Sequence, residues 1–464
     1  MKFYRPVFAL AGSVLAIAAC SGTDREPDTG GTGGAPSGGA SGAGGSSAPM
    51  GGGAPAGGRP NTGGGSAGGG AAMSGGSNAG GAEASGGGSS ETGGTGPMTG
   101  GADGSGGSDP GTGGGNGSGG GGSTTAEGPC DIYKAAGNDC VAAYSTIRRL
   151  FSTYTGPLYQ VRSGSNAMNT GSGGELHDVA QNASGFADKA AQDAACGSGT
   201  CTVAKLYDQS GHENHITVAK AGLTNGGANA ATDDFETIAN KGPLKVAGQD
   251  VYSLYMEARQ GYRQTVAGDG MALGDDPQGI YMLADGTRVG TACCWDFGNV
   301  TPNPKSYAEM NTLFLGIAYW GRGAGNGPWF GADFEAGVWM GGSNPGEPGW
   351  GGLNDAANAP ANSNNPAMKV KYALGFQKTG NGPERYALRM ADIATATSVT
   401  TAYAGNYPSG KHLDSKGAVV LGVGGDNSNY SFATFYEGAI MKGYPSDDTE
   451  NAVFQNVKAI GYGK

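Results

Sequence analysis

Residues 21–127 limit where this chain can fold. The segment consists mainly of Gly, Ser, Ala, Thr and Pro and has almost no large apolar side chain. Such a composition buries too little apolar surface to offset the entropy lost on ordering, so we expect disorder. A flexible coil of about 107 residues has a root-mean-square span of roughly 50–60 Å. We therefore predict a tether at 21–127 and a folded part at 128–464, which is long enough for a substantial core.

The N-terminus has the layout of an export signal. Lys2 and Arg5 precede an apolar run at 7–16 that is too short to cross a bilayer, and small residues then lead to Cys20. The ending Ile-Ala-Ala-Cys resembles a bacterial lipobox, in which the cysteine is lipidated. The sequence thus predicts a signal peptide at 1–20 and an exported lipoprotein, held at the outer membrane or cell surface by its lipid or released from it. Ordinary secretion with cleavage elsewhere is the alternative.

The formal net charge of −11 excludes one class of partner. Nucleic-acid binding needs patches of Lys and Arg, and the sequence contains no block of basic residues. The acidic balance otherwise only favours solubility. We expect a monomer that binds no nucleic acid.

Beyond residue 200 the apolar runs are short, rich in β-branched and aromatic residues, and separated by turn residues. Patterns such as KVKYALGF and RYALRM alternate like half-buried strands. We expect strands within 201–209, 279–286, 312–320, 368–377, 385–392, 398–405, 417–425 and 433–443. Helical patterns occur at 140–154 and 448–460, the second with a capping signal. The sequence therefore predicts an all-β protein, a mostly antiparallel β-sandwich with a few short helices.

The chain has seven cysteines, and lipidation of Cys20 would leave six in an oxidising compartment. Sequence alone cannot choose among the connectivities that six cysteines allow. Short separations favour two local pairs, Cys130–Cys140 and Cys196–Cys201.

If both local pairs form, the adjacent Cys293 and Cys294 remain for each other. Their Cα atoms would be about 3.8 Å apart, below the usual range for a disulfide, so such a ring is strained. Strain of this kind tends to persist where function uses it. Two ordinary long-range bridges are the alternative.

The segment 319–342 combines aromatic rings with paired acids. Trp320 and Trp329 flank a glycine-rich loop, and Asp333 and Glu335 follow two positions apart. In a strand this spacing places both carboxyl groups on one face. Indole rings stack on the C–H faces of sugars while acids bind hydroxyl groups, so the segment is a candidate sugar site. The alternative is an ordinary solvent-facing strand beside two core tryptophans.

A second candidate lies at 422–440. Asp426 follows two glycines at the end of an apolar run, and glycines let a ligand approach the backbone. Asn427 adds an amide donor and acceptor. The same residues are also good turn formers, and Glu437 is a rival carboxylate.

The segment 207–216 places His212 and His215 beside Asp208 and Glu213. A metal site is one interpretation, but the chain has only four histidines and no second cluster supports it. A hydrogen-bonded turn is the favoured interpretation. We expect neither a metal nor a cofactor.

Five segments together carry a family resemblance. They are GPCDIYKAAGNDCVAAYSTIRRLF, LYDQSGHENHI, ACCWDFGN, GAGNGPWFGADFEAG, and LGVGGDNSN with the later TFYEG and GYPSDDTENAV. In this order, from about residue 128 to the C-terminus, the chain resembles the catalytic domain of α-L-arabinofuranosidase B, glycoside hydrolase family 54. The resemblance implies a concanavalin-like sandwich (jelly roll) as the catalytic domain at 128–464. It also implies a retaining, exo-acting enzyme that releases terminal L-arabinofuranose from plant cell-wall polysaccharides such as arabinan and arabinoxylan.

The resemblance also implies roles for individual residues. The nucleophile would be Glu335 and the acid/base Asp426. Cys293 and Cys294 would form a vicinal disulfide that lines the sugar pocket, with Trp320 opposite. The remaining sugar contacts would come from Asp333, the backbone of Gly425, and Asn427.

Two departures and two rival functions qualify the resemblance. Relatives carry asparagines just after the glutamate, where this chain has Ala336 and Gly337, so a hydroxyl contact that affects affinity and sugar preference would be lost or replaced. Relatives often carry a C-terminal arabinose-binding trefoil domain, which we expect to be absent because the last motif is followed closely by Lys464. The rivals are a non-catalytic carbohydrate-binding protein on the same sandwich and a different glycosidase, such as another furanosidase.

Overall fold

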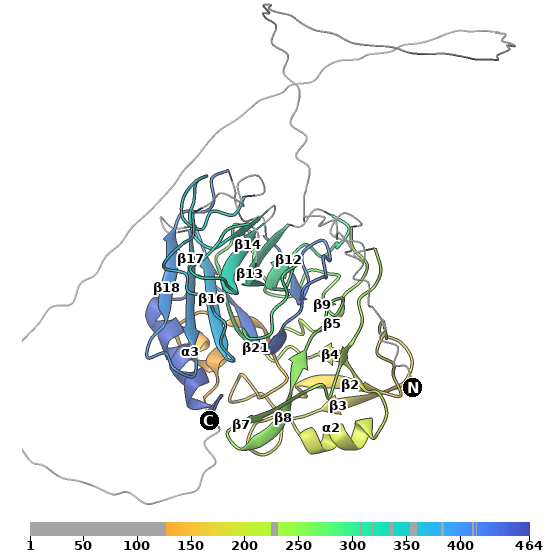
Figure 1. The fold of residues 1–464 in the computed structure, drawn as a ribbon. Coiled ribbons are helices and arrows are strands. Elements are labelled where there is room, and N and C mark those ends of the chain that lie inside the picture. The colour runs from red at the N-terminus through yellow and green to blue at the C-terminus, as the bar shows by residue number, and fades with distance from the viewer. Residues whose placement is uncertain are drawn as a thin grey trace, which may run out of the picture. The chain divides into compact units, whose positions relative to one another are not determined.

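The computed structural model describes residues 127–223, 231–306, 309–317, 320–334, 337–352, 360–381, 385–410, 413 and 415–464 (Figure 1). The predicted signal peptide at 1–20, with Cys20, lies outside the described residues. So do residues 21–126 of the predicted tether and the predicted nucleophile Glu335. These predictions remain untested by the structure.

The described residues form three helices and twenty-one strands. The helices are α1 (Pro129–Ala135), α2 (Lys189–Cys196) and α3 (Asp447–Ala459). The strands are β1 (Cys140–Ser145), β2 (Tyr159–Ser163), β3 (Glu175–Val179), β4 (Thr202–Leu206), β5 (Ile216–Val218), β6 (Thr237–Ile238), β7 (Gly242–Val246), β8 (Gln249–Tyr255), β9 (Tyr262–Arg263), β10 (Leu273–Gly274), β11 (Gln278–Ala284), β12 (Asp296–Val300), β13 (Met310–Gly316), β14 (Trp329–Phe334), β15 (Gly337–Trp339), β16 (Ala373–Thr379), β17 (Tyr386–Asp392), β18 (Thr400–Gly405), β19 (Ser415–Lys416), β20 (Ala418–Leu421) and β21 (Thr434–Lys442).

The strands pair into two large antiparallel sheets and one small one. The eight-stranded sheet has the order β18-β17-β16-β11-β21-β8-β7, and β1 also pairs with β21. The eleven-stranded sheet has the order β15-β14-β13-β12-β20-β9-β5-β4-β2-β3, and β6 pairs with β4. Strands β10 and β19 form the small sheet. The predicted antiparallel β-sandwich is confirmed, and each of the eight segments predicted to hold a strand overlaps one.

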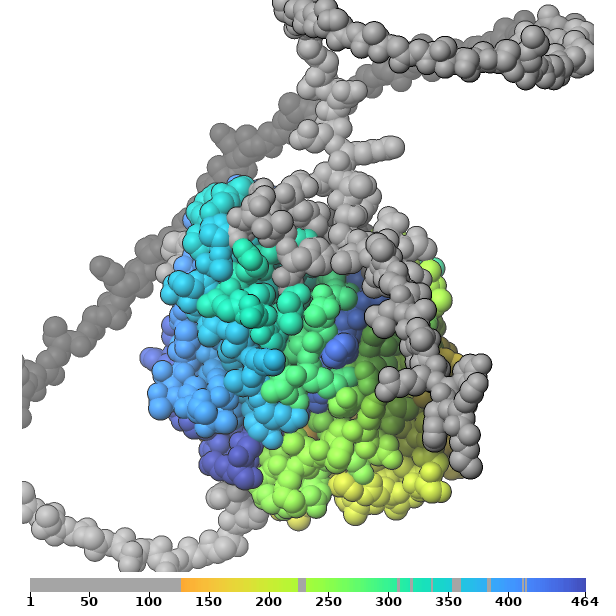
Figure 2. All heavy atoms as spheres, in the orientation of Figure 1, coloured from red at the N-terminus to blue at the C-terminus, as the bar shows by residue number. Residues whose placement is uncertain are grey.

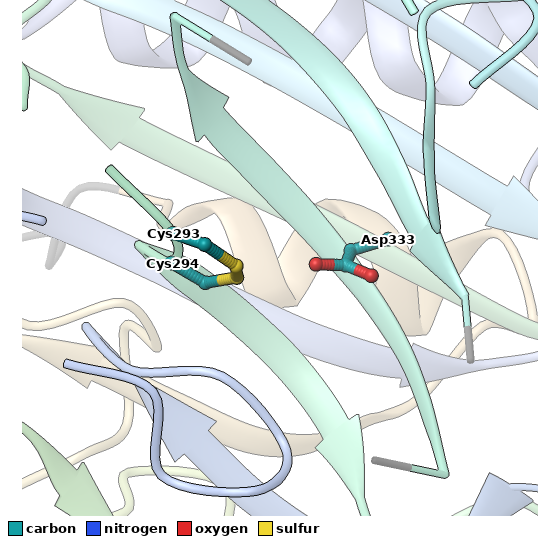
Figure 3. A group of neighbouring side chains, drawn as sticks. All are labelled: Cys293, Cys294 and Asp333. Carbon is teal, nitrogen blue, oxygen red and sulfur yellow. A yellow bond between two sulfur atoms is a disulfide. The ribbon is translucent and has the colours of Figure 1, made fainter. Parts of the chain in front are cut away.

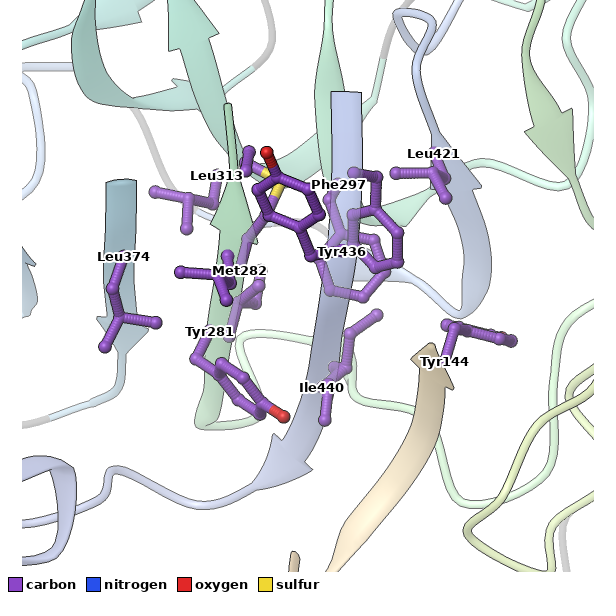
Figure 4. Close-up of a cluster of buried hydrophobic side chains, with 14 of the residues drawn as sticks. Tyr144, Tyr281, Met282, Phe297, Leu313, Leu374, Leu421, Tyr436 and Ile440 are labelled. Atoms are coloured by element: carbon purple, nitrogen blue, oxygen red, sulfur yellow. The ribbon is translucent and has the colours of Figure 1, made fainter. Parts of the chain in front are cut away.

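The core lies between the two large sheets, where alternate side chains of each strand point inward. A Cβ atom on Gly375 of β16 would lie 2.5 Å from the ring of Phe330 on β14, so glycine at this position lets the sheets approach. The Gln377 side chain on β16 donates a hydrogen bond to Asn311 Oδ1 on β13, with the two atoms 2.7 Å apart. Figure 4 shows part of the buried cluster, with labelled side chains from both sheets, among them Met282, Leu313 and Leu421.

Helices α1 and α3 cover the other face of the eight-stranded sheet, and α3 lies beside β16 to β18 in Figure 1. The ring of Tyr133 on α1 stacks on Tyr281 of β11, with ring centroids 6.0 Å apart. Glu450 of α3 is buried and accepts a hydrogen bond from Arg389 of β17 at 2.5 Å. The helix predicted at 448–460 is confirmed, with Ser446 as its N-cap. None of the helices in this part of the chain has the length and apolar character needed to cross a bilayer.

The helix predicted at 140–154 is wrong. Residues 140–145 form β1, every residue of which is buried, and Ala143 lies opposite Ala439 of β21. A short apolar run is compatible with a buried strand or a helix, and its periodicity alone cannot decide between them. Tertiary packing against β21 decides the outcome here, and the run CVAAYS becomes a strand buried on both faces.

Two disulfides connect helices to strands. Cys130 of α1 is bonded to Cys140 of β1, with Cα atoms 5.8 Å apart. Cys196 at the end of α2 is bonded to Cys201, just before β4, with Cα atoms 5.3 Å apart. The two predicted local pairs are therefore confirmed, and the third pair belongs to the candidate site.

The space-filling view shows how distant parts of the chain share one surface. In Figure 2, blue residues from the C-terminal part of the chain lie between green residues from its middle. A site on such a surface takes side chains from segments that are far apart in the sequence.

Candidate active site

Two buried aspartates share the face of the eleven-stranded sheet that points away from the core. Asp296 on β12 pairs with Phe314 on β13, and Thr312, two residues away on β13, pairs with Asp333 on β14. Paired residues and residues two apart project from the same face of a sheet. The residue that follows each aspartate is a phenylalanine of the main core. Period-two alternation therefore sends Asp296 and Asp333 to the outer face.

The vicinal disulfide of Cys293 and Cys294 is separated from β12 by one residue, Trp295. Figure 3 shows the carboxyl group of Asp333 pointing toward the two sulfur atoms. These sulfur atoms and a carboxylate oxygen of Asp333 all lie within 4.8 Å of one another. Because both cysteines are in a disulfide, they offer no thiolate to a metal ion. The arrangement is an apolar sulfur surface beside an acid, and the predicted third disulfide is confirmed.

The loop 424–430 brings Asp426 to the same place. The Tyr430 N–H donates to the Cys293 carbonyl oxygen at 3.3 Å, and the Cys294 N–H donates to the Ser428 carbonyl oxygen at 3.5 Å. The Ser428 hydroxyl donates to Asp426 Oδ1 at 2.5 Å and lies 3.9 Å from the Cys294 sulfur. Two motifs that are far apart in the sequence are thus joined by backbone hydrogen bonds, with Ser428 between the acid and the disulfide.

The carboxyl group of Asp426 is held from one side. Among the described residues, its hydrogen bonds come from the N–H of Ser428 at 2.9 Å and from the Ser428 hydroxyl, and both reach Oδ1. A backbone N–H can only donate, so Oδ1 is the accepting oxygen in either protonation state. This leaves Oδ2 as the oxygen that can carry and transfer a proton. The side chain is 5% exposed.

An apolar cluster borders the disulfide. Trp320 is buried in it, and Cys293 packs against it as a partly buried member. The other buried members are Phe314, Trp329, Val338 and Met340. The structure therefore brings Trp320 and the disulfide together, while their contact with a sugar ring stays a prediction.

The buried carboxyl groups of this site disfavour one another's ionisation. Burial raises the pKa of Asp333 well above its ordinary value, and the neighbouring carboxyl groups of Asp296 and Asp426 raise it further. Burial also raises the pKa of Asp296 well above 3.8, a polar contact with Thr312 opposes this shift, and Asp426 adds to it. Neighbouring buried carboxyl groups cannot all be ionised without cost, so the site favours the protonated state of Asp296 and Asp333.

Asp296 is the site residue that sequence reasoning missed. It is fully buried, and neither of its carboxyl oxygens makes a hydrogen bond with another described residue. The available signal was its position two residues after Cys294, at the start of an apolar run, where an acid is out of character. An acid at the first position of a buried strand is uncommon and indicates a special environment.

Gly425 and Asn427 have partners within the protein. The carbonyl oxygen of Gly425 accepts a hydrogen bond from Arg263 Nη1 at 2.7 Å. The side chain of Asn427 is fully buried and donates to Asp234 Oδ1 at 3.3 Å. The predicted contacts of these two residues with a sugar are untested, but the hydrogen bond of Asn427 indicates a role in holding the loop.

Two other candidates from the sequence, Glu437 and the 207–216 segment, make contacts of a structural kind. Glu437, on β21, is fully buried and accepts bonds from Arg148 at Nε and Nη2, both at 2.7 Å. In the 207–216 segment, Asp208 accepts from the backbone N–H groups of Ala143 and Asn214, and His215 Nδ1 accepts from the Asp208 N–H. These groups serve a structural ion pair and a hydrogen-bonded turn, as the favoured interpretation of that segment expects.

An apolar wall with acids beside it, on one sheet face of a β-sandwich, has the features expected of a carbohydrate-binding site. Comparison with known proteins then defines the family. Residues 129–463 match the family described as "Alpha-L-arabinofuranosidase B, catalytic". The chain belongs to this family, as the resemblance implied.

Curated relatives and solved structures agree with this assignment. The chain is 40% identical over 347 residues to an α-L-arabinofuranosidase of Hypocrea jecorina, a match that covers 74% of this chain and 64% of the relative. It is 37% identical over 348 residues to α-L-arabinofuranosidase B of Aspergillus kawachii, covering 73% and 64%. The chain therefore spans a little under two thirds of the length of these relatives.

Two solved structures are similar over most of the described domain. One is an arabinofuranosidase complexed with arabinofuranosyl-α-1,2-xylobiose, with a TM-score of 0.63 and 37% identity over 72% of this chain and 65% of that chain. The other is a glutamate-to-glutamine variant of a glycoside hydrolase family 54 α-L-arabinofuranosidase soaked with 4-nitrophenyl α-L-arabinofuranoside. Its TM-score is 0.62, with 36% identity over 72% of this chain and 66% of that chain.

The raised pKa of Asp296 predicts a pH dependence of stability. A carboxyl group whose pKa is raised on folding contributes stability that is fully present below its unfolded pKa of 3.8. This contribution is lost as the pH rises through the folded pKa. We expect Asp296→Asn, which cannot ionise, to lose less unfolding free energy than the wild type between about pH 4 and about pH 8. Urea unfolding at both pH values measures this difference.

Asp139→Asn provides the matched control for this comparison, because it removes an exposed acid just before β1. Its pH dependence should follow that of the wild type. Equal loss of stability in the wild type and Asp296→Asn would contradict the assignment of a buried, protonated carboxyl group.

Proposed function

We propose that this chain is a retaining, exo-acting α-L-arabinofuranosidase that releases terminal L-arabinofuranose from arabinan- and arabinoxylan-type hemicellulose. One observation carries the proposal: Asp426, Asp333 and the Cys293–Cys294 disulfide meet on one sheet face, in a chain of the arabinofuranosidase B family. The solved relatives, one complexed with an arabinofuranosyl-xylobiose and one soaked with an aryl arabinofuranoside, support this substrate class.

The first step is the transfer of the sugar to the enzyme. A carboxylate oxygen of Glu335 attacks the anomeric carbon, the bond from that carbon to the leaving oxygen breaks, and the proton of Asp426 moves to the leaving oxygen. The two hydrogen bonds from Ser428 fix Oδ1, so Oδ2 is the oxygen that delivers the proton. The product of this step is a covalent arabinosyl ester of Glu335.

The second step is hydrolysis of that ester. Asp426, now ionised, takes a proton from water, the water oxygen attacks the anomeric carbon, and the ester bond to Glu335 breaks. Asp426 regains its proton and Glu335 its charge, so the enzyme returns to its starting state. Two displacements at one carbon retain the anomeric configuration.

Sugar recognition uses the apolar wall and the acids around it. The disulfide and Trp320 offer a flat apolar surface to the C–H groups of the furanose ring. Asp333, beside the sulfur atoms, binds a hydroxyl group, and the backbone of Gly425 makes a second contact from a loop that Arg263 holds at the Gly425 carbonyl. A protonated Asp333 can donate as well as accept a hydrogen bond.

Loss of the nucleophile tests the proposal most directly. The wild type should release L-arabinose with retained configuration from an aryl α-L-arabinofuranoside and from arabinan, followed by NMR. Glu335→Gln cannot form the ester and should lose activity on the order of 10⁴–10⁶-fold. Normal turnover by this variant would remove Glu335 from the mechanism. Arabinan binding by the wild type without sugar release would favour a carbohydrate-binding protein.

Loss of the acid should depend on the leaving group. Asp426→Ala cannot protonate the leaving oxygen, so kcat should fall about 10²–10⁴-fold on substrates with poor leaving groups and much less on activated aryl glycosides. Azide should restore activity toward the activated substrates, because it attacks the covalent intermediate without a general base. Equal losses on all substrates would exclude the acid role.

We propose export of this protein with a lipid on Cys20, supported by the lipobox-like ending and by three disulfides, which persist in oxidising compartments. Mass spectrometry of the mature N-terminal peptide should detect an acylated Cys20, because lipidation precedes cleavage at that residue. The Cys20→Ala variant should appear unacylated. An unmodified peptide that begins at another residue would instead indicate ordinary secretion.

A further inference from the structure

A buried carboxyl group lies behind the loop that carries Asp426. Asp234 is fully buried, and its Oδ1 accepts hydrogen bonds from the side-chain amides of Asn427 at 3.3 Å and Asn429 at 2.5 Å. These two asparagines flank Ser428 in the chain, and Ser428 makes both hydrogen bonds to the Asp426 carboxyl group. One oxygen of Asp234 thus holds the loop on both sides of the residue that fixes the acid.

The backbone around Asp234 is anchored independently of its side chain. The Asp234 N–H donates to the carbonyl oxygen of Ala219 at 3.0 Å, and the Phe235 N–H donates to that of Arg259 at 2.8 Å. A Cβ atom on Gly261 would lie 2.8 Å from Asp234 Oδ2, so the carboxyl group fits closely against this backbone. Asp234 is therefore a fixed point to which the loop is attached.

The loop needs such a support. Asn427 has a φ of +66°, in the left-handed region that non-glycine residues adopt at a cost. Arg259 reinforces the attachment, because its N–H donates to the Asn429 carbonyl oxygen at 2.7 Å. Leu223 adds a third link, since its N–H donates to the Asp426 carbonyl oxygen at 3.1 Å. Without the hydrogen bonds to Asp234, the side chains of Asn427 and Asn429 would lose their shared acceptor.

We propose that Asp234 is a positioning residue for the acid/base: it holds Asn427 and Asn429 so that Ser428 orients the carboxyl group of Asp426 toward the leaving oxygen. This inference rests on the proposed function and deepens it. Asp234 itself touches neither the disulfide nor Asp333 among the described contacts, so it acts through the loop.

The electrostatic surroundings of Asp234 indicate which substitution preserves its role. Burial raises the pKa of Asp234 to about 7, against the two asparagine hydrogen bonds and the positive charge of Arg259, while Asp233 adds to the shift. Arg263, which binds the Gly425 carbonyl, also interacts electrostatically with Asp234. A neutral carboxyl group still accepts hydrogen bonds through Oδ1, and so does the amide oxygen of asparagine. The acceptor, rather than the charge, is the feature required.

The test compares Asp234→Ala with Asp234→Asn on two aryl α-L-arabinofuranosides, one with an activated and one with a poor leaving group. Asp234→Ala should lower kcat about tenfold more on the poor leaving group than on the activated one, with little change in KM, because only the proton-transfer step is misaligned. Asp234→Asn should restore most of kcat. Equal losses on both substrates, or a loss in Asp234→Asn as large as in Asp234→Ala, would overturn the proposal.

A double-mutant cycle separates this inference from the proposed function. Adding Asp234→Ala to Asp426→Ala should cause no further loss on the poor leaving group, because the residue acts through an acid that is already absent. Independent, additive losses would overturn the positioning role while leaving the acid role intact. If Asp426→Ala itself shows no dependence on the leaving group, the proposed mechanism fails first.

Two further variants distinguish a positioning role of Asp234 from general destabilisation of the protein. Asn429→Ala removes one donor from the other side of the same contact and should reproduce the dependence on the leaving group. Asp208→Ala removes a buried aspartate that also accepts several hydrogen bonds but lies in the 207–216 turn. It should lower thermal stability without changing the ratio of activities on the two substrates. A changed ratio in Asp208→Ala would show that general destabilisation is sufficient.

Discussion

The alternation of side chains along β12, β13 and β14 is the constraint on which both the core and the site depend. One set of alternate residues packs against the eight-stranded sheet, where Gly375 leaves room for Phe330. The other set carries Asp296, Phe314 and Asp333 to the outer face. A shift of pairing by one residue would exchange the two sets and bury charges in the core, so the core fixes the register that the site requires.

Backbone hydrogen bonds between two loops add Asp426 to the acids that the strands position. The Cys293–Cys294 segment and residues 428–430 are joined by backbone hydrogen bonds, which set Asp426 beside the disulfide. Gly424 makes this approach possible: a Cβ atom there would lie 2.6 Å from the Ser428 hydroxyl oxygen, closer than side-chain carbons normally come. Gly424, two residues before the acid, therefore has a steric role within the protein, in addition to any approach of a ligand to the backbone.

The sequence allowed good prediction of whatever depends on local pattern. Alternating runs identified strands such as β16 and β17, a capping signal identified α3, and short separations identified two disulfides. The family resemblance supplied the third disulfide and the meeting of Asp333 with the cysteines. Long-range packing could not be predicted from the sequence. The run CVAAYS was predicted as a helix because its pattern fits a helix or a strand, and only the pairing with β21 decides for the strand. Asp234 carries no local signal either, since its partners lie 193 and 195 positions away.

Two sets of buried acids among the described residues differ in their partners. Glu437 and Glu450 each meet an arginine in close ion pairs behind the eight-stranded sheet, where an unpaired charge would be strongly destabilising. Asp296, Asp333 and Asp234 have no such cation at hydrogen-bonding distance among the described residues, and burial raises the pKa of all three. Leaving a buried polar group unsatisfied costs about 1–3 kcal/mol. Both oxygens of Asp296 and Oδ2 of Asp234 lack a hydrogen bond from another described residue. These acids lie around the place where we propose sugar binding and proton transfer, in agreement with the rule that perturbed carboxyl groups cluster where chemistry uses them.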